Sequence, residues 1–367
     1  MKQGWEIKKL GEVSTITMGQ SPSSNTYNDT EGLPFFQGNA DFGKIHPSVR
    51  VYCNAPIRIA EVNDILISVR APIGAINIAD CKCCIGRGLA SIRNNAEVAN
   101  EYIYHALVAN KEKLIAQGTG STFKSIGKEA IKELSIPIPP LEEQERIVEE
   151  LDCLSGVIEK KKQQLKELDA LAQSIFYQMF GDPITNEKGW ESCELQKVST
   201  LLNGRAYKQN ELLEEGKYKV LRVGNFFTNS NYYYSDLELE SDKYCDDGDL
   251  LFAWSASFGA FIWKGGKVIY HYHIWKVLYD QQKLNIDYYR FLLNTMTAYF
   301  MKDVHGIGMV HLTKAGMEQY VLPIPPLALQ QQFADRIEKI EQQKKLISQS
   351  IKEVEDLFNS RMNYYFN

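Results

Sequence analysis

The sequence lacks the features that define several large classes of protein. Its 367 residues hold no apolar run near about 18 residues, and its start, MKQGWEIKK, has no hydrophobic stretch of the kind found in signal peptides. Its seven cysteines show no disulfide-framework spacing, which fits a reducing compartment. We therefore expect a soluble, cytoplasmic protein with room for two or three domains.

Motifs for catalysis and for cofactor binding are also missing. The glycines at 118–120 and 306–308 lack the full GxGxxG pattern and the strand-turn-helix context of a dinucleotide site. We find no adenine-methyltransferase motif of the form (N/D)PP(Y/F) and no nuclease-like set of carboxylates and a lysine. Cys81, Cys83 and Cys84 have no second Cys or His pair at zinc-site spacing, so we interpret them as buried or incidental thiols. We predict no metal or cofactor bound by this chain.

The chain also lacks the positive charge of a strong stand-alone nucleic-acid binder. Affinity for DNA comes mainly from neutralised phosphates, whereas this chain carries a formal net charge of −5 at pH 7. If it binds DNA, we expect it to bind weakly alone and to rely on partner proteins for much of the contact with the backbone.

What the chain does have is an internal repeat with a period of 185 positions. The matched landmarks are GWE at 4–6 and 189–191, VST at 13–15 and 198–200, and the single glycines Gly19 and Gly204. Further on, LSIPIPPL at 134–141 matches YVLPIPPL at 320–327, so that Trp5 to Pro137 is 132 positions and Trp190 to Pro323 is 133. Because these landmarks keep their spacing across divergent sequence, the chain is predicted to be a tandem duplication.

Each copy ends in a long helical pattern that starts directly after the diproline. Proline is favourable in the first turn of a helix and holds the preceding residue extended, so PIPPL is a stiff lead-in that starts a helix at a fixed angle. Apolar residues at helical spacing form one stripe on each helix. The candidates for helix pairing and partner docking are Ile147, Leu151, Leu154, Ile158 and Leu165 in the first helix, and Phe333, Ile337, Ile340, Ile347 and Ile351 in the second. Neither helix can bury its stripe alone, so we expect the two to pair antiparallel, with the globular parts at opposite ends and an approximate two-fold symmetry.

The remaining segments predict a mixed α/β (α+β) fold. We place one globular domain at 1–136 and another at 186–322, with a spacer helix at 137–181 and a C-terminal helix at 323–367. The runs DILISV at 64–69 and DLLFAW at 249–254 predict strands, and helices are expected near 100–116 and 286–302. Outside the landmarks the copies share little. A common scaffold with unlike surfaces indicates one task performed on two different targets.

Loops in both copies carry residue types that can read base edges in a DNA groove. The candidates are Gln37, Asn39, Lys44, Arg70, Arg87 and Lys124 in the first copy, and Arg205, Lys208, Arg222, Asn225, His271, His273, Lys276 and His311 in the second. For any one of them a solvated surface position is the competing interpretation. His271 and His273 would lie on the same side of a strand and could bind a metal, but no third ligand follows at a suitable spacing.

The two variable parts, each opened by a GWE...L...V...G stretch and closed by a PIPPL...Q helix, resemble the specificity subunit of a type I restriction-modification system. The resemblance covers essentially the whole chain. PIPPLEEQERIVEEL at 137–151 is very close to the family's pattern, and PIPPLALQQQFADRI at 323–337 is a looser copy. The resemblance implies that each globular domain is a target-recognition domain that reads one half of a bipartite sequence in double-stranded DNA. The helix pair would set the spacing between the two halves.

The resemblance also implies the partners. Two modification subunits would dock on the repeated parts and methylate adenine with S-adenosylmethionine, which they and not this chain would bind. Restriction subunits with ATP-dependent endonuclease activity can join them. The specificity subunit itself would be non-catalytic and would need no membrane.

Two other functions stay open on the residues alone. One is a coiled-coil adaptor that does not bind DNA and whose globular ends bind proteins. The other is a nuclease with a cryptic active site. Exchange of the first globular domain without a change in the methylated motif would favour the adaptor, and metal-dependent cleavage by the purified chain would favour the nuclease.

Overall fold

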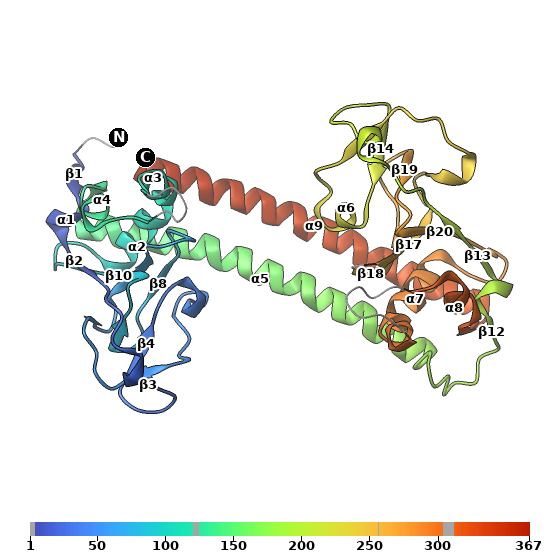
Figure 1. Cartoon of the computed structure of the whole chain (residues 1–367), viewed down its shortest axis with the longest axis horizontal. Helices are drawn as coiled ribbons and strands as arrows, with labels where there is room; N and C mark the ends of the chain where they lie inside the picture. The colour runs from blue at the N-terminus through green and yellow to red at the C-terminus, as the bar shows by residue number, and fades with distance from the viewer. Residues whose placement is uncertain (1–3, 120–124, 256, 304–311) are drawn as a thin grey trace. The chain divides into compact units, whose positions relative to one another are not determined.

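The stretch after each PIPPL motif forms one uninterrupted helix (Figure 1). The computed structural model describes residues 4–119, 125–255, 257–303 and 312–367. In it, α5 covers Leu141–Phe180 and α9 covers Leu327–Phe366, each 40 residues long. Two expected helices of this length are therefore confirmed, and both begin directly after the diproline.

The chain folds as two compact units that each contain one globular part and pieces of both long helices. Unit 1 comprises Met1–Lys162 and Gln349–Asn367, and unit 2 comprises Gln163–Ser348. In unit 1 the carboxylate of Glu150, near the start of α5, accepts hydrogen bonds from Arg361 and from the Tyr365 hydroxyl near the end of α9.

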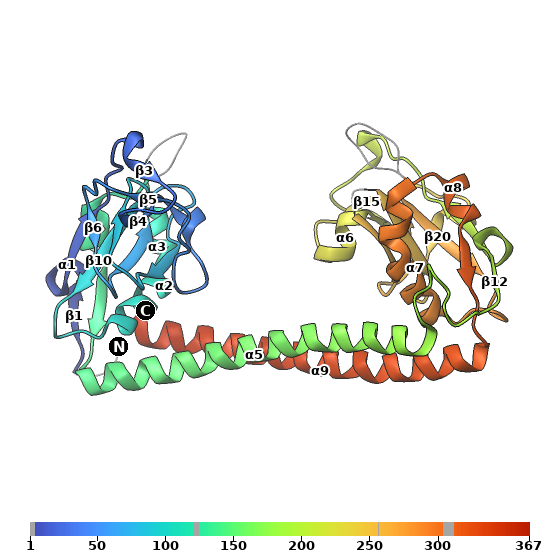
Figure 2. The ribbon, with the colours of Figure 1, turned by 90° about the horizontal axis from the view of Figure 1, so that it is seen from below.

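The same antiparallel arrangement holds in unit 2. There the Lys344 Nζ of α9 pairs with Asp169 Oδ1 of α5 at 2.7 Å. The ring centroids of Phe176 on α5 and Phe333 on α9 lie 5.7 Å apart. Within unit 2 the two helices run side by side (Figure 2). Antiparallel pairing of the two helices is thus confirmed within each unit.

The predicted stripe residues are mostly buried, and several of them pack against a globular part as well as the other helix. Ile147 and Leu151 lie in the core of unit 1 together with the α9 residues Met362, Tyr365 and Phe366. The buried members of the stripes are Ile147, Leu151, Ile158, Phe333, Ile337, Ile340 and Ile351, whereas Leu154, Leu165 and Ile347 are half-buried. Full burial of such a side chain contributes about 1.5–3 kcal/mol, so these contacts anchor each helix to its globular part.

Unit 1 contains two main sheets and a small two-stranded one. The first is antiparallel in the order β2 (Ser14–Met18), β10 (Leu89–Asn94), β7 (Ile65–Ser68) and β8 (Ile76–Ile78). The second has the order β3 (Tyr27–Asn28), β5 (Tyr52–Cys53), β4 (Leu33–Phe36), β9 (Cys83–Ile85) and β6 (Ile59–Ala60), with β4 and β9 parallel. The small sheet joins β1 (Glu6–Lys9) to β11 (Ser135–Ile138).

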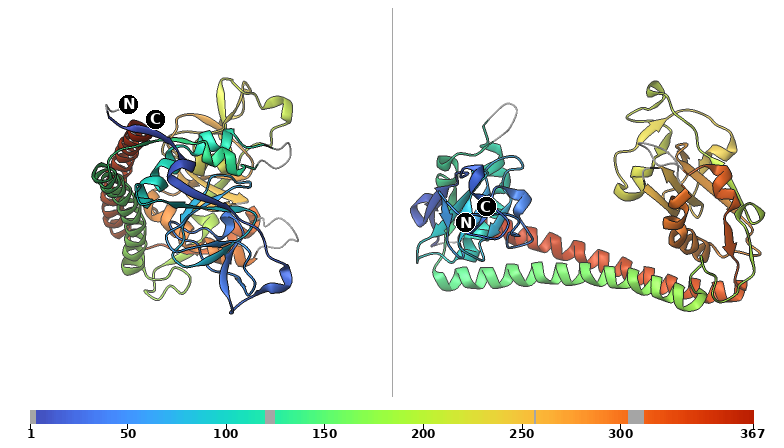
Figure 3. Two further views of the ribbon diagram at one scale, coloured as in Figure 1. Left: turned by 90° about the vertical axis from the view of Figure 1, so that its left-hand side faces the viewer. Right: turned by 60° about the horizontal axis from the view of Figure 1, so that its bottom comes forward.

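Unit 2 also has two main sheets and a small two-stranded one. Its globular part is drawn in yellow and orange in Figure 3. Its first sheet has the order β13 (Ser199–Asn203), β20 (Ile274–Tyr279), β17 (Leu250–Ser255) and β18 (Ser257–Ile262). Its second has the order β15 (Tyr233–Ser235), β14 (Tyr218–Leu221), β19 (Val268–Tyr270) and β16 (Tyr244–Cys245), with β14 and β19 parallel, and β12 (Ser192–Glu194) pairs with β21 (Val321–Pro323). The equivalent strands pair in the same register, since Ile92 opposite Ile16 corresponds to Val277 opposite Leu201. The structure therefore supports the tandem duplication.

Shorter helices cover the sheets. In unit 1 these are α1 (Leu10–Val13), α2 (Asn100–Ala109), α3 (Lys111–Ala116), α4 (Lys128–Lys132) and the 3₁₀ turns η1 (Ser24–Thr26) and η2 (Asn39–Asp41). In unit 2 they are α6 (Val223–Thr228), α7 (Ile286–Phe300), α8 (Lys314–Gln319) and the 3₁₀ turns η3 (Leu195–Lys197), η4 (Gln209–Glu211), η5 (Ser241–Lys243) and η6 (Met301–Asp303). The helices expected near 100–116 and 286–302 are present, but the first is broken at Asn110, whose side chain donates to Ala106 O at 2.9 Å.

Each PIPPL motif is held by the same two side chains, which we call the PIPPL clamp: Tyr102 and Gln144 in unit 1, and Tyr288 and Gln330 in unit 2. Each tyrosine hydroxyl donates to the carbonyl of the first proline of the motif at 2.8 Å. Both glutamines are 0% exposed. These bonds tie the extended lead-in and the first turn of the helix to the globular part.

In each clamp glutamine, the side-chain amide oxygen and both N–H groups make hydrogen bonds. The Gln144 Oε1 accepts from Ala99 N at 2.9 Å, and its Nε2 donates to Pro139 O at 2.8 Å and Glu97 O at 3.2 Å. The Gln330 amide makes the equivalent three bonds. These bonds explain why the diproline and the glutamine have the same spacing in both copies.

Two of the three clustered cysteines are buried, and Cys81 is half-buried. Cys83 and Cys84 are buried on β9, and burial raises the pKa of Cys83 to about 12 and that of Cys84 to about 11. Both thiols therefore stay protonated near neutral pH and are poor metal ligands. Within the described residues, no group of three or more His, Cys, Asp and Glu side chains is placed to hold a metal ion. In the same part of the chain, no helix is both long enough and apolar enough to traverse a lipid bilayer.

Candidate nucleic-acid interface

Four chain segments of unit 1 meet at one end of its sheets, at a place we call the loop junction. Its centre is the turn 86–88 between β9 and β10. The backbone of this turn bonds to the segment after β4 (Gly86 N to Phe36 O, 2.8 Å) and to the segment after β7 (Val69 N to Gly88 O, 2.8 Å). The segment after β2 closes the junction, with Gly19 N donating to Leu89 O at 2.9 Å.

Unit 2 builds the same loop junction around the turn 271–273 between β19 and β20. The matching bonds run from His271 N to Leu221 O at 2.9 Å and from Trp254 N to His273 O at 3.1 Å. Gly204 N donates to Ile274 O at 3.3 Å. Each bond lies 185 positions after its counterpart, so the two units display side chains from the same backbone positions although the residues differ.

The repeated glycines of the sequence are explained by this junction. A Cβ atom on Gly19 would lie 2.2 Å from the Gly86 carbonyl oxygen, and one on Gly204 would lie 2.4 Å from the carbonyl oxygens of Tyr270 and His271. Real Cβ atoms do not approach backbone oxygens so closely, so only glycine lets the strand end pass this near to the turn.

In unit 1, three of the predicted base-reading residues lie in the loop junction. Gln37, Arg70 and Arg87 are all exposed. Gln37 lies against the turn, because a Cβ on Gly88 would be 2.2 Å from the Gln37 carbonyl oxygen. No ion pair is found for Arg70 or Arg87 within the described ranges, so both guanidinium groups are available to a ligand.

In unit 2, four predicted residues lie in the junction: Arg205, Arg222, His271 and His273. Arg205 makes a bidentate ion pair with Glu211, in which its two terminal nitrogens donate to the two carboxylate oxygens at 2.9 and 2.8 Å. This ion pair lowers the pKa of Glu211 to about 2. The exposed Arg222 lies over the Tyr233 ring at 5.3 Å. Its guanidinium has no carboxylate partner in the part of the chain that the structure covers.

The two histidines lie in a turn and not on a strand, which corrects the strand geometry expected for them. The turn still brings their rings to 4.8 Å between centroids. Burial, aided by the neighbouring His273 and Arg222, lowers the pKa of His271 to about 4. His271 is therefore neutral near pH 7, a state in which one ring nitrogen donates and the other accepts a hydrogen bond.

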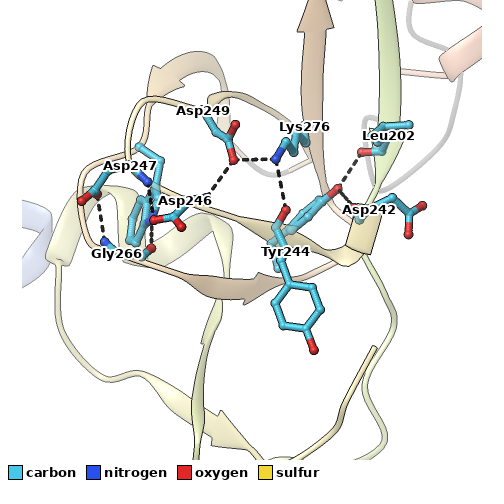
Figure 4. A network of polar contacts seen from close by, with 10 residues as sticks. Leu202, Asp242, Tyr244, Asp246, Asp247, Asp249, Gly266 and Lys276 are labelled. Atoms are coloured by element: carbon cyan, nitrogen blue, oxygen red, sulfur yellow. Dashed lines mark hydrogen bonds and ion pairs between the residues drawn. The ribbon is translucent and has the colours of Figure 1, made fainter. Parts of the chain in front are cut away.

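Three other predicted residues are engaged within their own unit. The Lys44 amino group pairs with Glu159 of α5 at 2.7 Å. Asn225 is only 6% exposed, and its amide accepts from Arg222 N and donates to Ser230 O, each at 2.8 Å. Lys276 donates to Asp249 Oδ2 at 2.6 Å and to Tyr244 O at 3.3 Å (Figure 4). The bonds of Asn225 and Lys276 favour structural roles for these two residues. The Lys44 side chain is 68% exposed in its ion pair, and its base-reading role stays a prediction.

The remaining predicted base-reading residues lie at the edges of the loop junction or outside the described residues. Asn39 begins η2, two residues beyond Gln37, and the exposed Lys208 follows Arg205 by three residues. Lys124 and His311 lie outside the described residues.

Sequence reasoning missed two residues of the junction. Gln20 is exposed and is equivalent to Arg205, since Gln20 N donates to Ile85 O and Arg205 N to Tyr270 O, each at 3.0 Å. Tyr272, 37% exposed at the apex of its turn, is equivalent to Arg87. Applying the 185-position offset to the residues around the turns would have identified both.

Comparison with known proteins shows the family. The model of the type I restriction modification DNA specificity domain matches residues 2–170 and 187–356, one match for each copy of the repeat. The chain therefore belongs to the type I restriction-modification DNA specificity family.

Particular relatives can be named. Over 177 residues the chain is 43% identical to the putative type I restriction enzyme MjaX specificity subunit of Methanocaldococcus jannaschii, covering 47% of this chain and 42% of the relative. It is 28% identical over 247 residues to the MjaIX specificity subunit of the same organism, covering 60% of this chain and 57% of the relative. The chain thus spans about half the length of these two relatives.

A solved structure shares the fold along the whole chain. The crystal structure of the S subunit of a type I restriction-modification system from M. genitalium aligns with a TM-score of 0.57 and 13% identity, covering 100% of this chain and 98% of that one. The arrangement of two globular parts with two long helices is therefore a known fold.

Proposed function

We propose that this chain is the non-catalytic DNA-recognition subunit of a type I restriction-modification complex. Each globular part would read one half of a bipartite target in double-stranded DNA, and the helix pair would set the distance between the halves. The complex would act in the cytoplasm.

One observation carries this proposal: the same loop junction occurs twice with different hydrogen-bonding side chains. A duplicated protein that bound two identical ligands would be expected to keep the same residues at both sites. Here the turn Gly86-Arg87-Gly88 of unit 1 is replaced by His271-Tyr272-His273 in unit 2. Arginine, glutamine and neutral histidine are suited to the edges of base pairs in the major groove.

The repeat also supports two docking positions for one kind of partner. The first residues of the two long helices, Leu141 and Leu327, are 46% and 39% exposed although both are apolar. In unit 2 a shallow apolar groove on the helix pair is lined by Leu168, Leu171, Leu346 and Ile347. We propose that two modification subunits bind such surfaces, carry S-adenosylmethionine and methylate adenine, and that restriction subunits join them.

Single-molecule methylome sequencing tests the function. The chain would be expressed with its neighbouring modification subunit in cells without other methylation. We expect a split motif with methyladenine in both halves and a fixed gap. No new methylation from two soluble proteins that purify together would overturn the proposal.

The same experiment separates the alternatives. If the first globular part is exchanged for that of a relative, one half of the methylated motif should change. A motif that stays the same would favour the adaptor. Magnesium-dependent cleavage of DNA by the purified chain alone would favour the nuclease.

A further inference from the structure

The loop junction presents three pairs of equivalent positions near its surface. The backbone bonds that define the junction place residue 20 with 205, residue 37 with 222, and residue 87 with 272. All three positions are exposed in unit 1, and in unit 2 only Arg205 is half-buried. The side chains at these positions therefore leave the two scaffolds from matching points.

The residue types at these positions differ in every pair. Unit 1 has two glutamines and then an arginine, at Gln20, Gln37 and Arg87. Unit 2 has two arginines and then a tyrosine, at Arg205, Arg222 and Tyr272. Glutamine pairs through two hydrogen bonds with adenine, and arginine does so with guanine. Each exchange thus changes which base the position can recognise.

The three arginines Arg87, Arg205 and Arg222 differ in the groups that they contact. Arg205 is held by both oxygens of Glu211, so its charge is compensated and its guanidinium is fixed. Arg222 lies over the Tyr233 ring and is exposed. Arg87 projects from a turn flanked by two glycines, and neither glycine adds a side chain that would cover it.

We propose that Arg87 and Arg222 each recognise a guanine, one in each half of the target, and that Gln37 recognises an adenine in the half read by unit 1. This inference rests on the proposed function and adds to it the residues that determine specificity. Arg205 acts as a positioning residue that holds the segment after β13.

The test is the methylated motif of single variants in the assembled complex. Arg222→Gln should weaken the preference for guanine at one position of the methylated motif, or change that preference to adenine, in one half only. Methylation of the original motif should fall roughly ten- to hundredfold. Arg87→Gln should do the same in the other half. Gln37→Arg, which installs the residue type of unit 2, should shift one adenine of the first half towards guanine.

Lys197→Gln serves as the charge-matched control. Lys197 is exposed and lies in η3, at the opposite end of β13 from the junction. This variant should keep the wild-type motif and extent of methylation.

The outcomes separate the two proposals. If the wild-type complex methylates no motif, the proposed function fails before the variants are compared. If the wild type methylates a split motif and both arginine variants keep it unchanged, this inference is wrong. An equal loss at every site, with no change in base preference, would also overturn it, because that pattern marks phosphate contacts.

Discussion

At the scale of single residues, the buried glutamines of the PIPPL clamp show what the repeat preserves. Gln144 and Gln330 are polar, yet no part of either side chain reaches solvent. A buried amide is tolerated only when its donors and acceptor are all satisfied, and both residues meet this condition. The motif repeated in the sequence is therefore a joint between a helix and its globular part.

Truncating either glutamine should destabilise its own unit. Gln144→Ala or Gln330→Ala leaves three backbone groups without a partner, and we expect a loss of about 1–3 kcal/mol in the free energy of unfolding, measured with urea. Gln164→Ala, at an exposed position of α5, should change it by less than about 0.5 kcal/mol. Equal effects of Gln144→Ala and Gln164→Ala would contradict the clamp.

The turn in unit 2 should make stability depend on pH. The pKa of His271 is lowered from 6.5 to about 4 in the folded state, so between these values the unfolded chain binds more protons. Stability should therefore fall as the pH drops from about 6.5 towards 4. The decrease in melting temperature from pH 7 to pH 5 should be smaller in His271→Gln than in the wild type, and an equal decrease would refute this expectation.

At the scale of elements, the sequence was most informative where the pattern was long or repeated. The stripes of α5 and α9 and the diprolines predicted both helices, and the 185-position spacing predicted the shared scaffold. Individual polar residues were harder to place. Asn225 and Lys276 were expected on surface loops, but Asn225 caps the turn at the start of α6, and Lys276 on β20 pairs with Asp249, directly before the neighbouring strand β17. The Lys276 partner depends on which strands are neighbours, which local sequence does not encode.

The end of α9 should stabilise unit 1 and not unit 2, although it follows unit 2 directly in the chain. The ring of Phe366 lies 5.1 Å from that of Tyr102 in the core of unit 1. We expect Phe366→Ala to destabilise unit 1 by about 3–5 kcal/mol while unit 2 keeps its protection in hydrogen exchange followed by mass spectrometry.

A second variant on the same helix controls for general effects. Leu357 is 48% exposed, and Leu357→Ala should leave the protection of both units near that of the wild type. Loss of protection in unit 2 upon Phe366→Ala would show that the assignment of this segment to unit 1 is wrong.

At the scale of the whole molecule, both helices cross the division between the units, after Lys162 and after Ser348. If the proposed function holds, insertions at these two points should change the spacing of the two half-sites. Four residues inserted at both points would lengthen each helix by ~6 Å. With base pairs ~3.4 Å apart, the unspecified gap in the methylated motif should widen by about one or two base pairs. A gap of unchanged length would exclude a role of the helices as a ruler.

Unit 2 is one continuous stretch of chain, whereas unit 1 needs Gln349–Asn367 to complete its core. During synthesis, the first 162 residues of unit 1 leave the ribosome long before its last segment, Gln349–Asn367, does. At about 5–20 residues per second the wait is on the order of ten to forty seconds. The part made first is therefore completed last, and until then its exposed apolar surface is open to chaperones and to premature association with other nascent chains.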